Sequence, residues 1–195
     1  MKEYYDARAP EYDDVWLGRG RFAHRHDGGW FEEVTLLLGG IASLPAARTL
    51  DVACGTGFLT RHLHGDLTGL DHSRRMLDEA RRKAPDATFV QGDALDLPFE
   101  DGEFDRLFTS FFYGHLEGED RDRFIGECRR VARELVFVDA SRERAGVDAE
   151  HQQRVLGDGS RWSVYKRYFR AEELADELGG GDVLHAGRWF VMVRA

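Results

Sequence analysis

The chain has 195 residues, and its 42% hydrophobic and 12% aromatic content is enough for a hydrophobic core, which excludes a generally disordered protein. Its 36 acidic and 27 basic residues give a formal net charge of −9, so we expect no nucleic-acid partner, because such binding depends on neutralised phosphates. Two cysteines are too few for a disulfide scaffold or a four-cysteine zinc site, and we expect no bound metal.

The sequence shows neither a membrane helix nor a secretion signal. The longest apolar stretch, around Val34 to Ala47, contains Gly39, Gly40 and Pro45 and falls short of the roughly 20 residues that a membrane span requires. The first six residues lack an apolar core. We therefore expect a cytoplasmic protein of one domain, residues 1–195, without a membrane partner; the oligomeric state stays open.

Short apolar segments alternate with longer amphipathic ones, the pattern of an α/β fold with a mostly parallel sheet. We expect two helices within residues 2–42, strands at 49–53, 67–70, 88–91, 104–110 and 135–138, and helices at 58–64, 74–84, 120–133 and 171–178. The polar residues 141–160 predict a partly helical excursion over one end of the sheet. Residues 183–185 and 189–193 predict an antiparallel hairpin, because the connection between them is short.

Residues suited to ligand binding follow three of these strands. The sequence Asp51-Val52-Ala53-Cys54-Gly55-Thr56-Gly57 follows the first strand, Asp71 ends the second and Asp93 follows the third. In an open parallel sheet the carboxyl ends of the strands meet at one edge, where ligands bind. Glycines allow close backbone approach, Asp71 suits the two hydroxyls of a ribose, and Asp93 suits an exocyclic amine.

Each of these features also has a purely structural interpretation. A glycine pair after a strand is often a tight turn, and an Asp at a strand end is often a helix cap or a solvated turn. The combination in this order favours a site for an adenosine-containing ligand. A nicotinamide site is disfavoured because Thr60 replaces the third glycine of G-x-G-x-x-G, and a negative charge at Asp51 suits an ammonium or sulfonium group better than a pyrophosphate.

Residues 51–57, with Asp71 and residues 91–99 (QGDALDLPF), resemble the class I S-adenosylmethionine-dependent methyltransferases, in particular their bacterial small-molecule subgroup. Residues 4–13 are similar to that family's N-terminal lid, and residues 102–105 and 113–116 to its fourth-strand region. The resemblance implies a Rossmann-like, seven-stranded, mostly parallel sheet with helices on both faces and a C-terminal antiparallel hairpin. It divides the chain into a lid (1–45), a cofactor-binding core (46–140), a roof over the substrate (141–170) and a last helix with hairpin (171–195).

The resemblance also implies the activity and the cofactor site. S-adenosylmethionine would donate its methyl group by in-line displacement to an O, N or C atom of a small molecule, leaving S-adenosylhomocysteine. A non-methylating scaffold or regulatory protein that keeps the same fold is the alternative. The residues expected to bind the cofactor are Asp51, Ala53, Gly55 and Gly57 around the methionine portion, Asp71 at the ribose, His72, Asp93 and Ala94 at the adenine, and Ser110, Phe111 and Tyr12 near the sulfonium.

The acceptor site is less defined by the sequence. His115 follows the fourth strand and suits a general base, because an unperturbed imidazole has a pKa of about 6.5; the alternative is a hydrogen bond to the backbone. Tyr113, Arg25, Arg154 and Trp162 are further candidates for contact with the acceptor, although Trp162 equally suits a core position.

Overall fold

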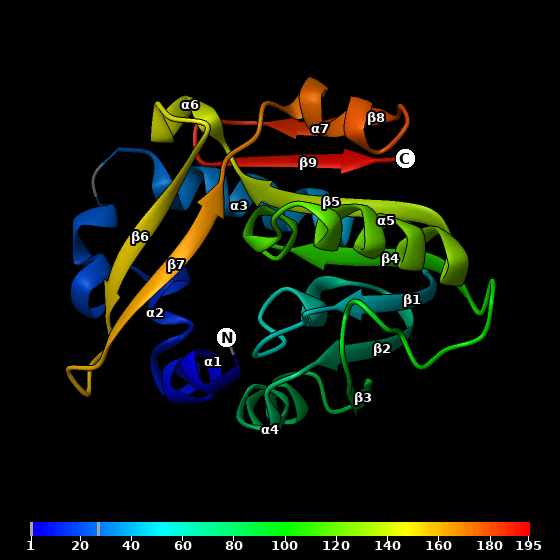
Figure 1. Ribbon diagram of the computed structural model, residues 1–195, viewed down its shortest axis with the longest axis horizontal. Coiled ribbons are helices and arrows are strands. Elements are labelled where there is room, and N and C mark those ends of the chain that lie inside the picture. Colours follow the sequence, from blue (N-terminus) through cyan, green and yellow to red (C-terminus); the bar gives the residue numbers. More distant parts are fainter. Residues whose placement is uncertain (1, 27) are drawn as a thin grey trace.

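The computed structural model describes residues 2–26 and 28–195, apart from the side chains of Arg21, Arg25 and His26. Its centre is a seven-stranded sheet in the order β3-β2-β1-β4-β5-β9-β8 (Figure 1). Its strands are β1 (Ala47–Val52), β2 (Gly65–Asp71), β3 (Thr88–Gln91), β4 (Phe104–Ser110), β5 (Ala132–Ala140), β8 (Asp182–Ala186) and β9 (Phe190–Arg194). Strands β1 to β5 are parallel, whereas β9 is antiparallel to both β5 and β8. The predicted sheet and its C-terminal antiparallel hairpin are confirmed.

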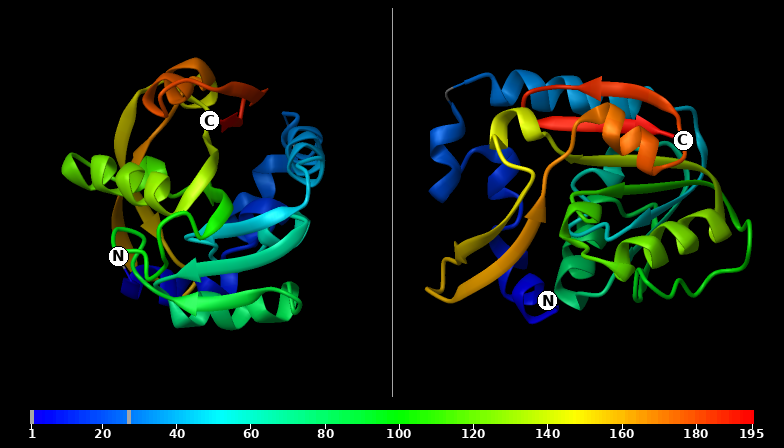
Figure 2. Two further views of the ribbon diagram at one scale, coloured as in Figure 1. Left: turned by 90° about the vertical axis from the view of Figure 1, so that its right-hand side faces the viewer. Right: turned by 45° about the horizontal axis from the view of Figure 1, so that its top comes forward.

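Helices cover both faces of the sheet, because successive residues of a strand point to opposite sides. In β4, Leu107 packs in one cluster with α5 (Glu119–Val131) and α7 (Ala171–Glu177). Its neighbour Phe108 packs in a second cluster with α3 (Trp30–Ala42). Figure 2 shows α5 and α3 on opposite sides of the sheet. Burial on both faces explains the continuously apolar run of residues 135–138 in β5.

Helix α4 (Arg74–Lys83) begins and ends where the sequence predicts. The Ser73 hydroxyl accepts a hydrogen bond from the Met76 N–H at 3.2 Å and caps the helix. A Cβ atom at Gly57 would lie 3.1 Å from the Cα of Ala80, so this glycine allows the loop after β1 to approach α4 closely. No helix within residues 2–26 and 28–195 is long and apolar enough to cross a membrane.

Two predictions for local structure are wrong. Residues 58–64 do not form a regular helix but only the single 3-10 turn η3 (Thr60–His62), because the backbone is already extended at Leu63 and leads into β2 at Gly65. The N-terminal region has more pieces than two helices. It contains α1 (Lys2–Arg8), η1 (Ala9–Glu11), α2 (Asp14–Leu17) and η2 (Gly20–His26) before α3, and left-handed glycines at 18 and 29 separate α2, η2 and α3.

The excursion after β5 is also different from the prediction. Its only helix in the described structure is the short α6 (Arg142–Ala145), and most of it is an antiparallel hairpin of β6 (Ala149–Val155) and β7 (Arg161–Arg167). The polar sequence of β6 hides the strand, because five of its seven residues are exposed, the other two, Gln152 and Arg154, are half-buried, and no apolar residue alternates with them. In Figure 1 this hairpin lies with α1 and α2 beyond the carboxyl ends of β1, β4 and β5.

Candidate functional site

A cavity of about 270 Å³ lies at the carboxyl ends of β1, β2 and β4. The three strand ends therefore meet at one site, as the order of the motifs predicts. The cavity is lined by most of the residues that the sequence assigns to a cofactor: Tyr12, Ala53, Gly55, Asp71, His72, Asp93, Ala94, Ser110 and Phe111.

Asp71 joins the ends of the first two strands. One carboxylate oxygen, Oδ2, accepts from the Gly55 N–H at 2.9 Å, and Oδ1 accepts from the Ser73 N–H at 2.8 Å. The side chain is buried, and this burial raises its pKa, while the bonds from Ser73 and Gly55 act in the opposite direction. A carboxylate has about four lone-pair sites, so two remain for a ligand.

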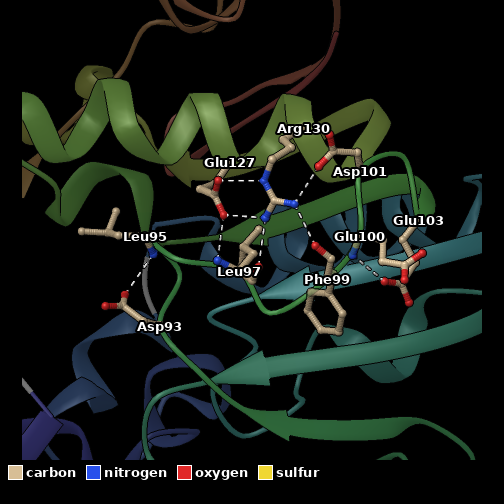
Figure 3. A network of polar contacts seen from close by, with 9 residues as sticks. All are labelled: Asp93, Leu95, Leu97, Phe99, Glu100, Asp101, Glu103, Glu127 and Arg130. Carbon is tan, nitrogen blue, oxygen red and sulfur yellow. Dashed lines mark hydrogen bonds and ion pairs between the residues drawn. The ribbon is translucent and has the colours of Figure 1, made fainter.

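The loop that carries Asp93 and Ala94 is held by Arg130 of α5 (Figure 3). The guanidinium donates to the carbonyl oxygens of Leu97 at 2.9 Å and Phe99 at 2.7 Å and pairs with Glu127 at 2.7 Å. Asp93 Oδ1 itself accepts from the Leu95 N–H at 2.9 Å. This bond closes a local turn, which is the purely structural function that an Asp after a strand often has. The same side chain is exposed and lines the cavity, so the turn orients it toward a ligand.

Asp51 and Gly57 do not line this cavity, in contrast to the other predicted cofactor residues. Asp51 is buried beneath it, and its Oδ2 accepts from the Thr60 hydroxyl at 2.5 Å. Burial raises the pKa of this carboxyl to about 7; the Thr60 bond lowers it and the nearby Asp71 charge raises it. Its second oxygen, Oδ1, is buried without a hydrogen-bond partner. Thr60, which disfavours a nicotinamide site, therefore serves to hold Asp51.

Backbone strain is concentrated at the same edge of the sheet. In the described part of the chain, the non-glycine residues with positive φ are Ala53 (57°) and Phe111 (54°). They directly follow β1 and β4, and both line the cavity. Such conformations are unfavourable for residues with a Cβ and persist where the surrounding structure imposes them, often at ligand sites.

A second cavity, of about 490 Å³, lies between the N-terminal segment and the β6–β7 hairpin. It shares Tyr5, Tyr12, Phe111 and His115 with the first cavity. The two cavities are therefore neighbours with a common wall. The first is framed by the strand ends, and the second by elements whose sequence does not match a nucleotide-binding pattern.

His115 lies on this common wall. Its Nδ1 is 2.5 Å from the Tyr165 carbonyl oxygen, which can only accept, so Nδ1 carries the proton and Nε2 has a free lone pair. Burial holds the pKa of this imidazole well below its usual range, and the charges of Lys166 and Arg154 act in the same direction. The ring is therefore neutral near pH 7. Both interpretations of His115 from the sequence are compatible, because the backbone bond and the base function use different nitrogens.

The remaining acceptor candidates are divided between the cavity and the core. Arg154 lines the second cavity. Tyr113 does not; it is buried among aromatic rings of the core, and its hydroxyl donates to Glu177 at 2.9 Å. Trp162 lines neither cavity. Its ring packs on Tyr4 with centroids 5.7 Å apart, so it has the packing position that the sequence offered as the alternative to acceptor contact. The side chain of Arg25 lies outside the described residues.

Two cations of the second cavity are absent from the sequence predictions. Arg8 and Lys166 both line it and are both buried. Lys166 Nζ forms an ion pair of 2.5 Å with Asp139, whose other oxygen accepts from the Gly114 N–H at 2.8 Å. The position of Asp139 at the end of an apolar strand is a signal that the sequence offers, whereas nothing in the local sequence indicates that Arg8 and Lys166 line one cavity.

Comparisons with known proteins agree with this geometry. Residues 49–135 match a family model described as a methyltransferase domain. A demethylmenaquinone methyltransferase of Thermotoga maritima is 39% identical over 110 residues, which cover 54% of this chain and 46% of that protein. One from Renibacterium salmoninarum is 36% identical over 166 residues, or 78% and 65% of the two chains. The chain thus spans about half to two thirds of these relatives.

A solved structure of a DhpI–SAH complex is similar over nearly the whole chain, with a TM-score of 0.74 and 26% identity. The similarity covers 98% of this chain and 92% of that one. A DhpI–SAM–HEP complex gives a TM-score of 0.73 at the same identity. Together these matches confirm the family resemblance drawn from residues 51–57, Asp71 and residues 91–99.

Proposed function

We propose that this chain, whose residues 49–135 form a methyltransferase domain of the class I S-adenosylmethionine-dependent type, transfers a methyl group from that cofactor to a small-molecule acceptor. The observation that carries the proposal is the wall shared by the two cavities, which has the neutral imidazole of His115 in it. A donor in the first cavity and an acceptor in the second would meet there.

The first cavity fits S-adenosylmethionine by the chemistry of its lining. When bound, this cofactor supplies a methyl group activated by a sulfonium. The free acceptor capacity of Asp71 suits the ribose hydroxyls, and the exposed Asp93 suits the adenine amine. The rings of Tyr12 and Phe111, on the shared wall, suit the sulfonium through cation–π attraction. The Asp51 carboxyl lies buried beneath this edge, and its negative charge, when ionised, would favour a cationic group in the cavity above it.

The N-terminal segment would act as the lid over this cofactor. Asp6 accepts from the Ser73 hydroxyl at 2.5 Å, and Asp13 accepts from the Thr56 hydroxyl at 2.6 Å. Asp13 also forms an ion pair with Lys83 of α4. These contacts fix the lid to the cofactor half of the molecule. A closed lid excludes water and aligns the reactants, which supplies much of the rate enhancement for a displacement whose leaving group is already activated.

His115 would remove the proton of the acceptor nucleophile. Its Nε2 lone pair takes the proton, and the Nδ1–H bond to the Tyr165 carbonyl stabilises the imidazolium that forms. The demethylmenaquinone methyltransferases that the chain resembles act, by their names, on a small molecule. With an acidic chain and a second cavity of about 490 Å³, we assign a small organic acceptor rather than a nucleic acid.

The test has two parts. Titration calorimetry should show that S-adenosylhomocysteine binds. Labelled S-adenosylmethionine incubated with a small-metabolite extract should give a labelled product whose formation depends on His115. The His115→Gln variant should bind the cofactor product normally but give little label. Binding without any labelled product would favour the scaffold alternative, and binding of NAD instead would contradict the proposal.

A further inference from the structure

The second cavity is cationic, although the whole chain carries a net charge of −9. The described lining contains the side chains of Arg8, Arg144, Arg154 and Lys166. Its only carboxylate among the described residues is Glu150, which is already engaged, because it accepts from the Tyr168 hydroxyl at 2.6 Å and from the Gln152 amide at 3.0 Å. Positive charge is thus collected at one place in an acidic protein.

Arg8 is a buried guanidinium without a carboxylate partner among the described residues. Only 8% of the residue is exposed, and its one hydrogen bond is the donation from Nη1 to the neutral Tyr4 hydroxyl. The rings of Tyr12 and Tyr4 lie 4.9 and 5.7 Å from its central carbon. These rings supply cation–π contacts rather than an anion, and Nε is buried without any acceptor among the described residues.

Arg154 comes to the same place from the β6–β7 hairpin. Its Nη1 donates to the same Tyr4 hydroxyl at 3.0 Å, and its other donors bond only to the neutral amide oxygen of Gln152. No described carboxylate pairs with it. Two guanidinium groups are therefore held around one hydroxyl, where they repel each other, and neither has a carboxylate at ion-pair distance among the described residues; Glu150 acts on Arg154 only through space.

The structural alternative is that these arginines only fix the lid to the hairpin. Other buried or half-buried cations of the hairpin have carboxylate partners, as Arg167 has in Glu177 and Lys166, which lines the same cavity, has in Asp139. Arg8 and Arg154 differ from them in facing this cavity of about 490 Å³ without a carboxylate at ion-pair distance among the described residues.

We propose that the methyl acceptor carries an anionic group, a carboxylate or a tetrahedral phosphate-type group, and that Arg8 and Arg154 bind it through charge-assisted hydrogen bonds. This inference rests on the proposed function, because it concerns the acceptor of the same reaction. The anion would lie beside the wall that holds His115 and would place the acceptor's nucleophilic atom at Nε2.

Binding of an anion would also help the base. Lys166, Arg154 and Arg8 all disfavour a proton on His115 in the empty cavity. An anion bound between the arginines offsets part of this positive charge, so the imidazole becomes a stronger base when the acceptor is present. This pair of arginines, the clamp of Arg8 and Arg154, would then couple acceptor binding to proton removal.

Calorimetry on the full chain saturated with S-adenosylhomocysteine tests the proposal. The probes are methylphosphonate and acetate, with neutral acetamide as control. We expect at least one anion to bind, with affinity that falls as salt increases, and acetamide to give no signal. Arg154→Gln should weaken the anion about tenfold or more, while Arg161→Gln, which removes the same charge from an exposed position of the same hairpin, should have no effect.

The two anions distinguish the chemistry of the group, since preference for methylphosphonate indicates a tetrahedral anion and preference for acetate a planar one. If S-adenosylhomocysteine binds but neither anion does, or if Arg154→Gln and Arg161→Gln are equivalent, the anionic acceptor is refuted and the methyltransferase proposal stands. If S-adenosylhomocysteine itself does not bind, the proposed function fails first.

Discussion

Replacement of Asp51 by Asn provides a sharp test of the electrostatics beneath the site. Burial raises the pKa of this carboxyl from 3.8 to about 7 in the folded chain. Between these two values the folded state holds a proton that the unfolded state has lost, so stability falls as pH rises, by about 1.4 kcal/mol per pH unit. Asn cannot ionise, and its side-chain oxygen can still accept from Thr60.

The variant should therefore gain about 3 kcal/mol of stability relative to the wild type as pH rises from 4 to 7, and the difference should level off above about pH 8. Urea unfolding at pH 5, 6, 7 and 8 measures it, with Asp66→Asn on the exposed start of β2 as the matched control. A difference between Asp51→Asn and wild type that does not change with pH, or that the control reproduces, would refute the raised pKa of this buried carboxyl.

Three further substitutions test the site and its support. Asp71→Ala should weaken S-adenosylhomocysteine binding by about 1–3 kcal/mol in calorimetry, through the lost charge-assisted hydrogen bonds, while Asp66→Ala should not; equal affinities would reject the ribose assignment. His115→Gln should slow methyl transfer about 100-fold or more with unchanged S-adenosylhomocysteine affinity. The acid limb of the wild-type kcat/KM profile should lie below pH 6.5, because burial lowers the pKa of the imidazole and keeps it neutral. An acid limb at or above pH 6.5 contradicts this. Asp139→Ala should lower the free energy of unfolding by about 3–5 kcal/mol in urea, because Lys166 would stay buried without its carboxylate; a loss under about 1 kcal/mol would show that the pair is not needed.

The sheet could be predicted from the sequence because its central strands are buried and turn residues bound the others. The predicted bounds of β3 and β4 agree with the structure, since Gly92 follows β3 and Asp101-Gly102 precede β4 as turn signals. The cofactor cavity followed from the same logic, because parallel strands deliver Asp71 and Asp93 to one edge whatever the details of the loops.

The elements that frame the acceptor cavity could not be predicted in the same way. Strand β6 is held by pairing with β7 and has no apolar alternation, so its sequence resembles a loop. The clamp of Arg8 and Arg154 joins residues from opposite parts of the chain around Tyr4, a contact that no local pattern encodes. Long-range contacts of polar side chains depend on the finished fold.

The most direct test of the account is a crystal structure of the chain with S-adenosylhomocysteine. We expect the adenosine between Asp71 and Asp93 and the sulfur at the wall formed by Tyr5, Tyr12, Phe111 and His115, facing the second cavity. A sulfur directed away from that wall, or a ligand bound outside the strand ends, would contradict the proposal that the two cavities hold donor and acceptor of one methyl transfer.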